Sequence, residues 1–288
     1  MIIIADSGST KCDWLVLNDD WDIINHVKTM GYNPYFHDEF FITGNLRQDD
    51  FFKEHHNEVK EVFFYGAGCS TEFYTNIVSK GLSNVFSKAK IKVNHDLMAS
   101  ALASYRGEPI IACILGTGSN SCHFDGETLI PGNPSLGFIV GDEASGSYFG
   151  KLLLNAYFNK MLPADLHKEF EKTYALNHDD FTAGVYSNRR ANVFLASFMK
   201  FFSTRKDHPY IKQVIQNGFR DFIEKHVCCF EDHTKLKVSF VGSIAFFFQE
   251  EIEELGPEYN LVFGDFIQKP VFSLVEFHRL GRTTKVKS

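Results

Sequence analysis

Short apolar runs separated by small polar residues open the chain and return near its middle. The first run, Ile2 to Ala5, ends in a turn rich in Ser, Gly and Thr. Two strand-like segments follow it, Asp13 to Leu17 and Asp22 to Lys28. Apolar runs joined by such a turn are typical of a β-hairpin. The chain is therefore predicted to open with three strands.

Helix and strand patterns then alternate up to a break at Gly107. Helical spacing and short strand-like runs predict a helix at His37 to Val59, a strand at Glu61 to Tyr65, a helix to Phe86 capped by Thr71, a strand at Ile91 to Val93 and a helix at Leu97 to Tyr105. The predicted order of the first lobe is β-β-β-α-β-α-β-α.

The same opening is repeated after this break. Ile110 to Leu115, a glycine turn and two strands at Ser121 to Phe124 and Thr128 to Ile130 match the first three strands. Ser7-Gly8-Ser9 and Thr117-Gly118-Ser119 occupy the same place in the two halves. An internal repeat of this kind predicts a duplicated architecture.

The second half departs from the repeat after these strands. A Gly/Pro-rich loop covers 132–141. The elements predicted after it are helices at 142–157, 164–175, 190–203, 210–230 and 244–255, strands at 237–241 and 260–263, and a closing helix at 270–280. We therefore expect an α/β protein with two lobes, 1–107 and 108–269.

Composition excludes several function classes. Of the 288 residues, 44% are hydrophobic and 23% are charged, which is typical of a globular protein with a substantial core. The net charge of −7 argues against a nucleic-acid partner. No window offers the ~20 apolar residues that a membrane helix needs, and the N-terminus lacks the basic region of a signal peptide. We expect a cytoplasmic protein with no membrane partner.

Neither the cysteines nor the basic end of the chain predicts a function. The cysteines form no C-x-x-C pair and no metal-ligand spacing with His, so we expect reduced and mostly buried thiols at Cys12, Cys69, Cys113, Cys122, Cys228 and Cys229. The only basic cluster is interpreted as a solvated end and consists of Arg279, Arg282, Lys285 and Lys287.

The two glycine turns are candidate phosphate sites. A turn rich in Gly, Ser and Thr leaves backbone N–H groups free to converge on an anion. The residues in question are Gly8, Ser9, Thr10 and Lys11 in the first turn and Gly116, Thr117 and Gly118 in the second. Asp6 would repel a phosphate, so we expect a hydrated Mg²⁺ as its partner. Either turn alone is also compatible with an ordinary hairpin.

Asp96 is the candidate catalytic base. Phosphoryl transfer needs donors around the phosphate, a divalent cation, and a group that orients the acceptor hydroxyl or takes its proton. A carboxylate between a predicted strand and a predicted helix can meet the last need, whereas the alternative is a plain helix cap. We favour the catalytic interpretation because both phosphate turns are present. The neighbouring His95 is given no role.

Three other positions have two interpretations each. Asn33, in a loop before Pro34, could contact a sugar or cap the turn. Gly242 could admit an adenine ring past its bare backbone or form an ordinary βα turn. Asp142 and Glu143 precede a helix, where acidic residues are common without function, but the glycines before them indicate a loop that approaches a ligand closely.

Other phosphate-binding signatures are missing from the sequence. It contains no G-x-x-x-x-G-K-[ST] motif, no G-x-G-x-x-G after the first strand and no H-R-D motif of protein kinases. Phosphate binding is therefore expected to use the paired turns.

Five segments, in this order, resemble the N-acetylglucosamine kinase family of the BadF/BadG/BcrA/BcrD ATPase group in the actin/hexokinase/Hsp70 superfamily. They are Asp6 to Lys11, Asn94 to Asp96, Leu115 to Asn120, Gly141 to Gly146 and Val241 to Ala245. The resemblance implies a two-lobed actin-like ATPase fold with duplicated ribonuclease H-like lobes and ATP as cofactor. It also implies that the C-terminal helix, 270–288, packs back on the N-terminal lobe.

The resemblance further implies roles for individual positions. The ATP-binding positions are Thr10, Thr117, Gly242 and Ala245. The sugar-binding positions are Asn33, Asp96, Ser119, Asn120 and Asp142, with the loop Ser135-Leu136-Gly137. Asp96 matches the family's base toward the sugar 6-hydroxyl.

The chain departs from the family pattern at two positions. Ser7 stands where the first turn usually has glycine, and Leu136 stands where the animal enzymes carry tryptophan. The ROK-type sugar kinases are a weaker match, since their cysteine/histidine zinc cluster is absent from the sequence.

Taken together, these features predict an ATP- and Mg²⁺-dependent kinase that phosphorylates the 6-hydroxyl of N-acetylglucosamine or a related hexosamine, such as glucosamine or N-acetylmuramic acid. Two other classes stay open: an ATPase activator of a 2-hydroxyacyl-CoA dehydratase or benzoyl-CoA reductase, and a non-catalytic sugar sensor. The expected partners are ATP and an amino sugar, and the sequence leaves a homodimer open.

Overall fold

The computed structural model describes residues 1–281 and divides into two compact units. Unit 1 comprises Met1–Pro109, Phe124–Ile130 and the C-terminal segment that starts at Lys269. Unit 2 comprises Ile110–His123 and Pro131–Gln268. Of the predicted basic tail, Arg282, Lys285 and Lys287 lie outside the described residues.

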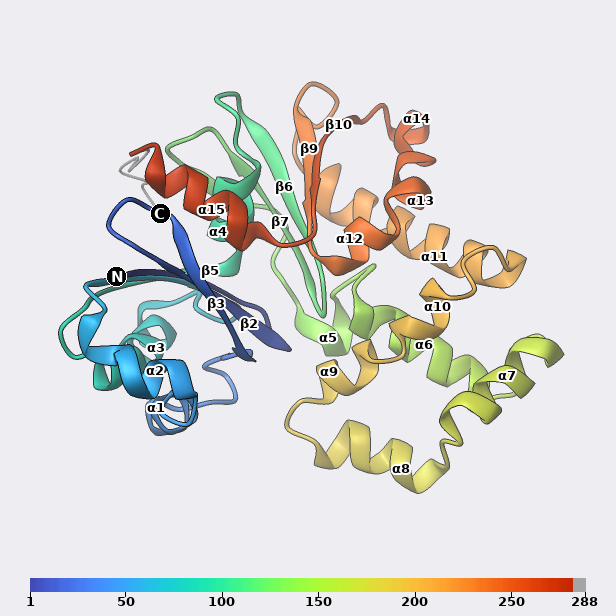
Figure 1. Cartoon of the computed structure of the whole chain (residues 1–288). Helices are drawn as coiled ribbons and strands as arrows, with labels where there is room; N and C mark the ends of the chain where they lie inside the picture. Colours follow the sequence, from blue (N-terminus) through green and yellow to red (C-terminus); the bar gives the residue numbers. More distant parts are fainter. Residues whose placement is uncertain (282–288) are drawn as a thin grey trace. The chain divides into compact units, whose positions relative to one another are not determined.

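Unit 1 is built on a five-stranded sheet with the order β3-β2-β1-β4-β5 (Figure 1). Its strands are β1 (Ile2–Ser7), β2 (Lys11–Leu17), β3 (Ile23–Met30), β4 (Glu61–Gly66) and β5 (Lys90–His95). The first three strands are antiparallel, which confirms the predicted opening. β4 and β5 run parallel to β1, so these three strands end at one edge of the sheet.

Helices cover both faces of this sheet (Figure 1). They are α1 (Glu39–Leu46), α2 (Asp50–His55) with the short 3₁₀ turn η1 (His56–Glu58), α3 (Glu72–Val85), α4 (Asp96–Ser104) and α15 (Pro270–Arg279). Thr71 caps α3, as predicted. The prediction of a single helix over His37 to Val59 was wrong, because this segment contains α1, α2 and η1. The Asp49 side chain accepts hydrogen bonds from the N–H groups of Phe51 and Phe52 and starts a new helix there.

The second sheet, most of whose strand residues belong to unit 2, has the order β10-β9-β6-β7-β8. Its strands are β6 (Ile110–Leu115), β7 (Ser119–Phe124), β8 (Leu129–Pro131), β9 (Lys237–Val241) and β10 (Val262–Ile267). When β6–β10 are matched in turn to β1–β5, the two sheets have the same strand order. The duplicated α/β architecture that the internal repeat predicted is therefore confirmed.

The helices of unit 2 differ in detail from the prediction. They are α5 (Gly137–Val140), α6 (Gly146–Phe158), α7 (Ala164–Tyr174), α8 (His178–Thr182), the π-helical turn η2 (Ala183–Ser187), α9 (Ala191–Ala196), α10 (Met199–Ser203), α11 (Pro209–Phe222), the π-helical turn η3 (Ile223–Val227), α12 (Ser243–Phe247), α13 (Gln249–Glu253) and α14 (Gly256–Tyr259). The segments 190–203 and 244–255 each contain two helices rather than one. A helical turn, α5, lies within the predicted loop.

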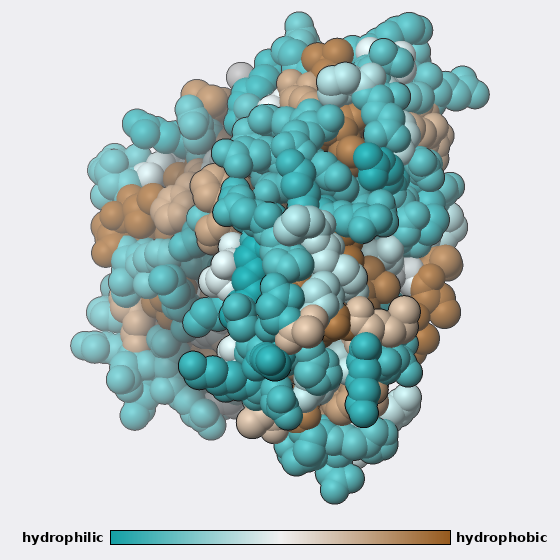
Figure 2. Space-filling view, turned by 90° about the vertical axis from the view of Figure 1, so that its right-hand side faces the viewer, coloured by the Kyte–Doolittle hydropathy of each residue, from teal (hydrophilic) through white to brown (hydrophobic). Residues whose placement is uncertain are grey.

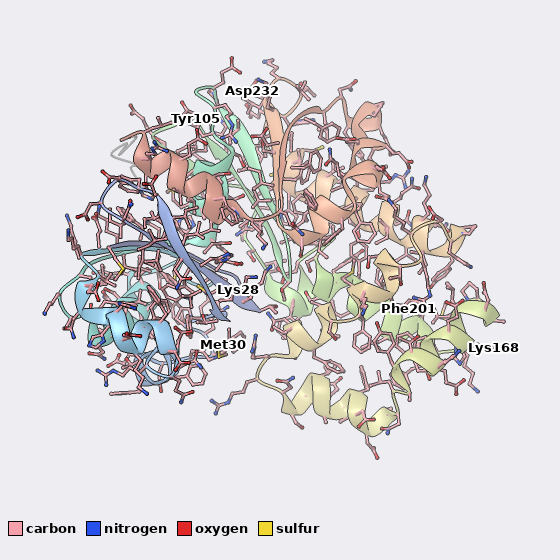
Figure 3. The ribbon with its side chains drawn as sticks, in the orientation of Figure 1. Lys28, Met30, Tyr105, Lys168, Phe201 and Asp232 are labelled. Atoms are coloured by element: carbon pink, nitrogen blue, oxygen red, sulfur yellow. The ribbon has the colours of Figure 1, made fainter. Side chains whose placement is uncertain are left out.

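Phenylalanine side chains fill much of both cores. In unit 1, Trp14 packs edge-on against Phe52, with ring centroids 5.3 Å apart. In unit 2, Phe201 is buried beside Phe170, whereas Lys168 lies on the outer side of α7 (Figure 3). Hydrophobic residues on the face drawn in Figure 2 occur only in separate groups among hydrophilic ones. Within residues 1–281, no helix is both long and apolar enough to cross a membrane.

Helix α15, at the end of the described chain, packs against the beginning of the chain. It packs against α4 and reaches β1 and β2. His278 is its polar anchor, because its Nε2 atom lies 2.9 Å from the Tyr65 hydroxyl in a buried hydrogen bond. The ring of Phe63 packs against the His278 ring at a centroid distance of 4.0 Å. Burial, with the nearby Lys92 ammonium, lowers the pKa of His278 to about 4, although Glu61 opposes the shift.

This environment predicts an acid-sensitive attachment of α15. An unfolded histidine binds its proton near pH 6.5, whereas folded His278 does so near pH 4. The unfolded state therefore gains protons first, so the contribution of His278 is complete above pH 6.5 and is lost as the pH falls to 4. Over that interval, wild type should lose about 3 kcal/mol of stability relative to His278→Phe. Urea unfolding at both pH values measures this, with the more exposed His55→Phe as control. A constant difference would contradict the prediction.

Candidate active site

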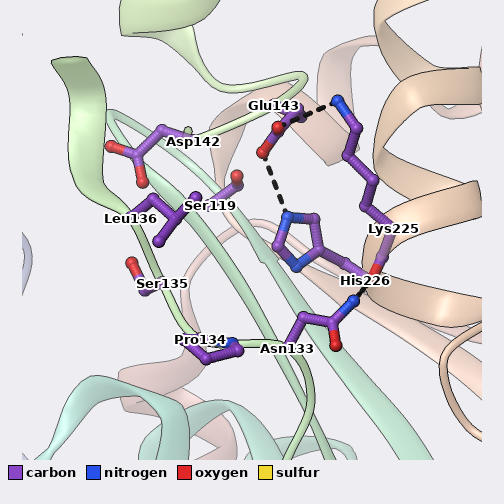
Figure 4. Close-up of a pocket in the computed structure, with 9 residues that line it drawn as sticks. All are labelled: Ser119, Asn133, Pro134, Ser135, Leu136, Asp142, Glu143, Lys225 and His226. Carbon is purple, nitrogen blue, oxygen red and sulfur yellow. Dashed lines mark hydrogen bonds and ion pairs between the residues drawn. The ribbon is translucent and has the colours of Figure 1, made fainter. Parts of the chain in front are cut away.

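A cavity of about 270 Å³ lies wholly within unit 2 (Figure 4). Its size suits a small ligand such as a monosaccharide, since pockets for drug-sized ligands measure about 300–1,000 Å³. The lining residues come from β7, from the loop before α5, from the segment before α6 and from η3: Ser119, Asn133, Pro134, Ser135, Leu136, Asp142, Glu143, Lys225 and His226. Four of the predicted sugar-binding residues, Ser119, Ser135, Leu136 and Asp142, are thus brought together.

The cavity contains a buried carboxylate that contacts a lysine ammonium group and a histidine ring. Glu143 Oε1 lies 3.1 Å from Lys225 Nζ, and its Oε2 lies 3.1 Å from His226 Nε2. Burial alone would raise the pKa of the Glu143 carboxyl, but its own backbone N–H, His226 and Lys225 together hold that pKa below its usual value. Glu143 is therefore ionised at neutral pH. From the sequence, two interpretations of this residue stayed open: an acidic residue in a first helical turn, or part of a loop that approaches a ligand.

Glycine allows the loops of this site to approach one another. An added Cβ at Gly118 would lie 2.9 Å from Asp142 Oδ2, so the second glycine turn passes directly beneath this carboxylate. Asp142 itself has a φ of 54°, in the left-handed region that few non-glycine residues adopt. Asp142 thus occupies a strained position beside the turn, which is typical of functional sites.

The second glycine turn is held by the N-terminus of α6 and by Gly242. The Gly146 N–H donates to the Gly116 carbonyl at 2.8 Å, and the Ser147 N–H donates to the Thr117 carbonyl at 3.1 Å. Gly242 has a φ of 117°, and an added Cβ would lie 2.4 Å from the Leu115 carbonyl oxygen. The predicted ATP-binding glycines of unit 2 therefore meet at one place.

Two other predicted residues of unit 2 have their side chains engaged within the protein. Ala245, predicted to bind ATP, is completely buried in the core, which leaves its side chain no accessible surface. The Asn120 side-chain oxygen accepts a hydrogen bond from the Ser121 N–H at 2.8 Å. Gly137, in contrast, starts α5 with a φ of 68° and has open space where a side chain would stand.

In unit 1, Ser7 fixes the first glycine turn to the loop before Asn33. Its buried hydroxyl accepts from the Tyr32 N–H at 2.9 Å and donates to the Tyr32 carbonyl at 3.3 Å. Gly31 contacts the backbone of Gly8, since an added Cβ would lie 1.9 Å from the Gly8 carbonyl oxygen. The serine that replaces the usual glycine thus has a structural role, whereas the exposed Gly8, Thr10 and Lys11 leave the outer side of the turn open.

Three carboxylates repel one another beside this turn. Burial raises the pKa of Asp6 to about 7, helped by the charges of Asp96 and Asp13 and opposed by Lys11. Asp6 and Asp13 are direct partners across β1 and β2. A divalent cation at Asp6 would relieve this repulsion. Within residues 1–281, no group of three His, Cys, Asp or Glu side chains is placed to hold a metal ion.

Asp96 begins α4, but it is not the cap of that helix. His95 is the N-cap residue, and its Nδ1 atom accepts the Met98 N–H at 3.2 Å. His95 therefore has a structural role as the helix cap, and the alternative of Asp96 as a plain cap is wrong. Asp96 Oδ1 accepts the Leu97 N–H at 2.9 Å. Burial raises the pKa of Asp96, partly offset by the neighbouring His95 and the Leu97 N–H.

Asn33 caps its own turn. Its side-chain oxygen accepts the Tyr35 N–H at 3.0 Å, and an added Cβ at Gly68 would lie 2.4 Å from that oxygen. Asn33 is also buried. These contacts favour a turn cap over a sugar contact as the role of its side-chain oxygen. The sequence did not indicate that Lys225, His226 and Asn133 line the cavity. Their position there depends on the π-helical turn η3 that follows α11.

A comparison with solved structures decides the family. A proposed N-acetylglucosamine kinase from Porphyromonas gingivalis is 32% identical, with 98% of this chain and 100% of that chain covered and a TM-score of 0.91. The chain belongs to the N-acetylglucosamine kinase family of sugar kinases. It is accordingly a phosphotransferase with the actin-like two-lobed fold.

Two more distant kinase structures share this fold. A proposed N-acetylglucosamine kinase from Chromobacterium violaceum is 14% identical, covers 96% of this kinase and 98% of its own chain, and has a TM-score of 0.66. A ROK family glucokinase from Streptomyces griseus, in complex with glucose and AMPPNP, is 15% identical with coverage of 97% and 98% and a TM-score of 0.53. Neither a protein-family model nor a curated protein matches the chain.

Lys151 of the kinase supports the loop that carries Leu136. From α6, its ammonium group donates a short hydrogen bond to the Phe138 carbonyl and another, of 3.4 Å, to the Ile139 carbonyl. Burial lowers the pKa of Lys151, while Asp142 and Glu143 oppose that shift. The exposed side chains of Leu136 and Ile139 indicate that few apolar contacts hold this loop.

Lys151→Met should therefore loosen the loop without unfolding unit 2. Methionine retains the apolar stem of lysine but cannot donate to the two carbonyls. Hydrogen exchange at Gly137–Gly141 should accelerate severalfold, and the loss should be about 1–2 kcal/mol because it is confined to charge-assisted bonds. Exchange mass spectrometry measures this, with the exposed Lys168→Met on α7 as control. Unchanged exchange at these residues would show that the loop keeps its conformation without the hydrogen bonds from Lys151.

Proposed function

We propose that the protein is a cytoplasmic, ATP-dependent kinase that phosphorylates the 6-hydroxyl of N-acetylglucosamine or a closely related hexosamine. The observation that carries this proposal is the cavity of unit 2, which gathers Ser119, Ser135, Leu136 and Asp142 at a scale that suits one sugar ring. The 32% identical relative is itself described as a proposed N-acetylglucosamine kinase.

The nucleotide is proposed to bind through the two glycine turns. In unit 1, Gly8, Ser9, Thr10 and Lys11 offer backbone, hydroxyl and ammonium donors. In unit 2, Gly116, Thr117 and Gly118 do the same, and Gly242 offers a backbone with no side chain. Mg²⁺ would be held by Asp6, and when bound it would neutralise charge on the transferred phosphoryl group.

Asp96 is proposed to orient the acceptor hydroxyl and to take its proton. A carboxylate whose pKa is raised above its ordinary value is a stronger base than an ordinary one as long as it is ionised. Burial supplies this shift at Asp96. The Leu97 N–H donates to Asp96 Oδ1 at 2.9 Å and so holds this carboxylate at the start of α4.

The activator alternative receives no support from the cysteines. Cys113 and Cys122 flank the second glycine turn but are completely buried in neighbouring strands. A thiolate that binds an iron–sulfur cluster needs to be accessible to the cluster. A homodimer remains compatible with the proposed kinase but plays no part in its proposed chemistry.

Sugar-dependent ADP release is the direct test of the proposal. We expect slow ATP hydrolysis by the protein alone and at least tenfold stimulation by one member of a panel of N-acetylglucosamine, glucosamine and N-acetylmuramic acid, because a bound sugar supplies the acceptor in place of water. A coupled assay measures ADP, and mass spectrometry locates the phosphate. Equal ADP release with and without every sugar would refute the kinase proposal and favour an ATPase.

Asp96→Asn should separate catalysis from binding. Asparagine keeps the size of the side chain and one acceptor oxygen but cannot take a proton. We expect kcat to fall roughly 10²–10⁴-fold, the usual contribution of a positioned base, with little change in ATP affinity or melting temperature. Because His95 caps α4, helix stability should be retained. Asp49→Asn at the cap of α2 is the matched control. Near-wild-type kcat would remove Asp96 from the proposed mechanism.

A further inference from the structure

Two polar atoms in the cavity of unit 2 have no partner within the described part of the chain. They are His226 Nδ1 and Ser119 Oγ, which are buried without any hydrogen bond. Both residues line the cavity, and each is only 6% exposed. A buried polar atom without a hydrogen bond destabilises a folded protein, so two of them in one cavity point to a ligand that completes their hydrogen bonds.

The Glu143 carboxylate determines which kind of partner His226 can accept. An ionised carboxylate only accepts hydrogen bonds, so the contact of 3.1 Å from His226 Nε2 to Glu143 Oε2 places the histidine proton on Nε2. In the neutral ring, Nδ1 then carries a lone pair and no proton. His226 therefore presents a buried acceptor, which needs an N–H or O–H group from the ligand.

The position of the His226 ring is fixed from several sides. η3 is a π-helical turn, closed by the Cys228 N–H donating to the Ile223 carbonyl at 2.8 Å. The Ser121 hydroxyl donates to the His226 carbonyl at 2.6 Å. The ring stacks on Phe222 with a centroid distance of 5.1 Å. Figure 4 shows it between Glu143 and the segment that contains Asn133 and Pro134. Such π-helical turns often occur at functional sites.

We infer that His226 determines substrate specificity by accepting a hydrogen bond from the N–H of the sugar's N-acyl group, and that Glu143 positions it and fixes its tautomer. This inference rests on the proposed function and names the substituent that the site reads. An N-acyl group carries one donor and one acceptor. It can satisfy His226 Nδ1 through its N–H and Ser119 Oγ through its carbonyl, whereas a hydroxyl at the same carbon offers its donor and its acceptor at a single oxygen atom and cannot reach as far.

The tautomer can be tested without any sugar. Long-range ¹H–¹⁵N spectra of the full-length protein should show Nε2 of His226 protonated and Nδ1 unprotonated. Glu143→Gln should relax this preference, because a glutamine amide can donate to Nε2 as well as accept from it. A protonated Nδ1 in the wild-type protein would overturn the inference.

Sugar affinity tests the role in specificity. Calorimetric titration would compare N-acetylglucosamine with glucose, which has a hydroxyl at the same carbon, and with 2-deoxyglucose, which has neither group. His226→Phe keeps the stacking on Phe222 but removes both nitrogens. It should weaken N-acetylglucosamine binding roughly 10- to 100-fold, the usual effect of an unpaired buried donor, and change 2-deoxyglucose binding less than about twofold. His226→Asn, which retains an acceptor near the Nδ1 position, should keep most of the preference.

The control variant is His167→Phe, where a histidine stacked on Tyr157 outside the cavity is replaced in the same way. Equal weakening of all three sugars by His226→Phe, or no weakening of N-acetylglucosamine, would overturn the inference. A wild-type protein that binds N-acetylglucosamine through His226 but releases no ADP would refute the proposed kinase while the inference stands. If the protein phosphorylates a hexosamine but His226→Phe keeps the preference for N-acetylglucosamine, the proposed kinase would stand and the inference about His226 would be refuted.

Discussion

The site of unit 2 depends on one close approach of backbone to backbone at the end of β6. Gly116 accepts a hydrogen bond from the first N–H of α6, and Gly242 lies so near Leu115 that no side chain fits between them. These contacts align the glycine turn, the N-terminus of α6 and the turn after β9. Asp142 and Glu143, which immediately precede α6, are thereby carried to the cavity. A larger residue at Gly242 would separate the two strands and displace all of these groups.

Much of the fold follows from local patterns in the sequence. The hairpin strands, the repeat of that hairpin after Gly107 and the capping of α3 by Thr71 each depend on neighbours in the chain, so periodicity and turn chemistry could predict them. The single helix expected over His37 to Val59 is divided because the Asp49 side chain starts a new helix, whereas the second helices within 190–203 and 244–255 begin without a side-chain cap. The carboxylate of Asp49 competes locally with the apolar spacing of the segment.

The candidate site was less predictable because it combines distant segments. Ser119, Leu136 and Asp142 were found through their motifs, but nothing in the sequence joins Glu143 to His226, 83 residues further on. That contact requires α11 to end in a π-helical turn, which apolar spacing does not signal. The same holds for Ser7, whose bonds to Tyr32 explain a departure from the family pattern only after folding.

The two sheets share their strand order, yet the segments between the hairpin and the next strand differ greatly. In unit 1 this interval holds α1, α2 and η1, whereas in unit 2 it covers 132–236 and holds the elements from α5 to η3. All the cavity residues except Ser119 belong to that longer interval. If the proposed roles hold, an exchange of this interval would alter substrate choice while both glycine turns remained intact, so that phosphate chemistry and substrate recognition would be inherited as separate modules.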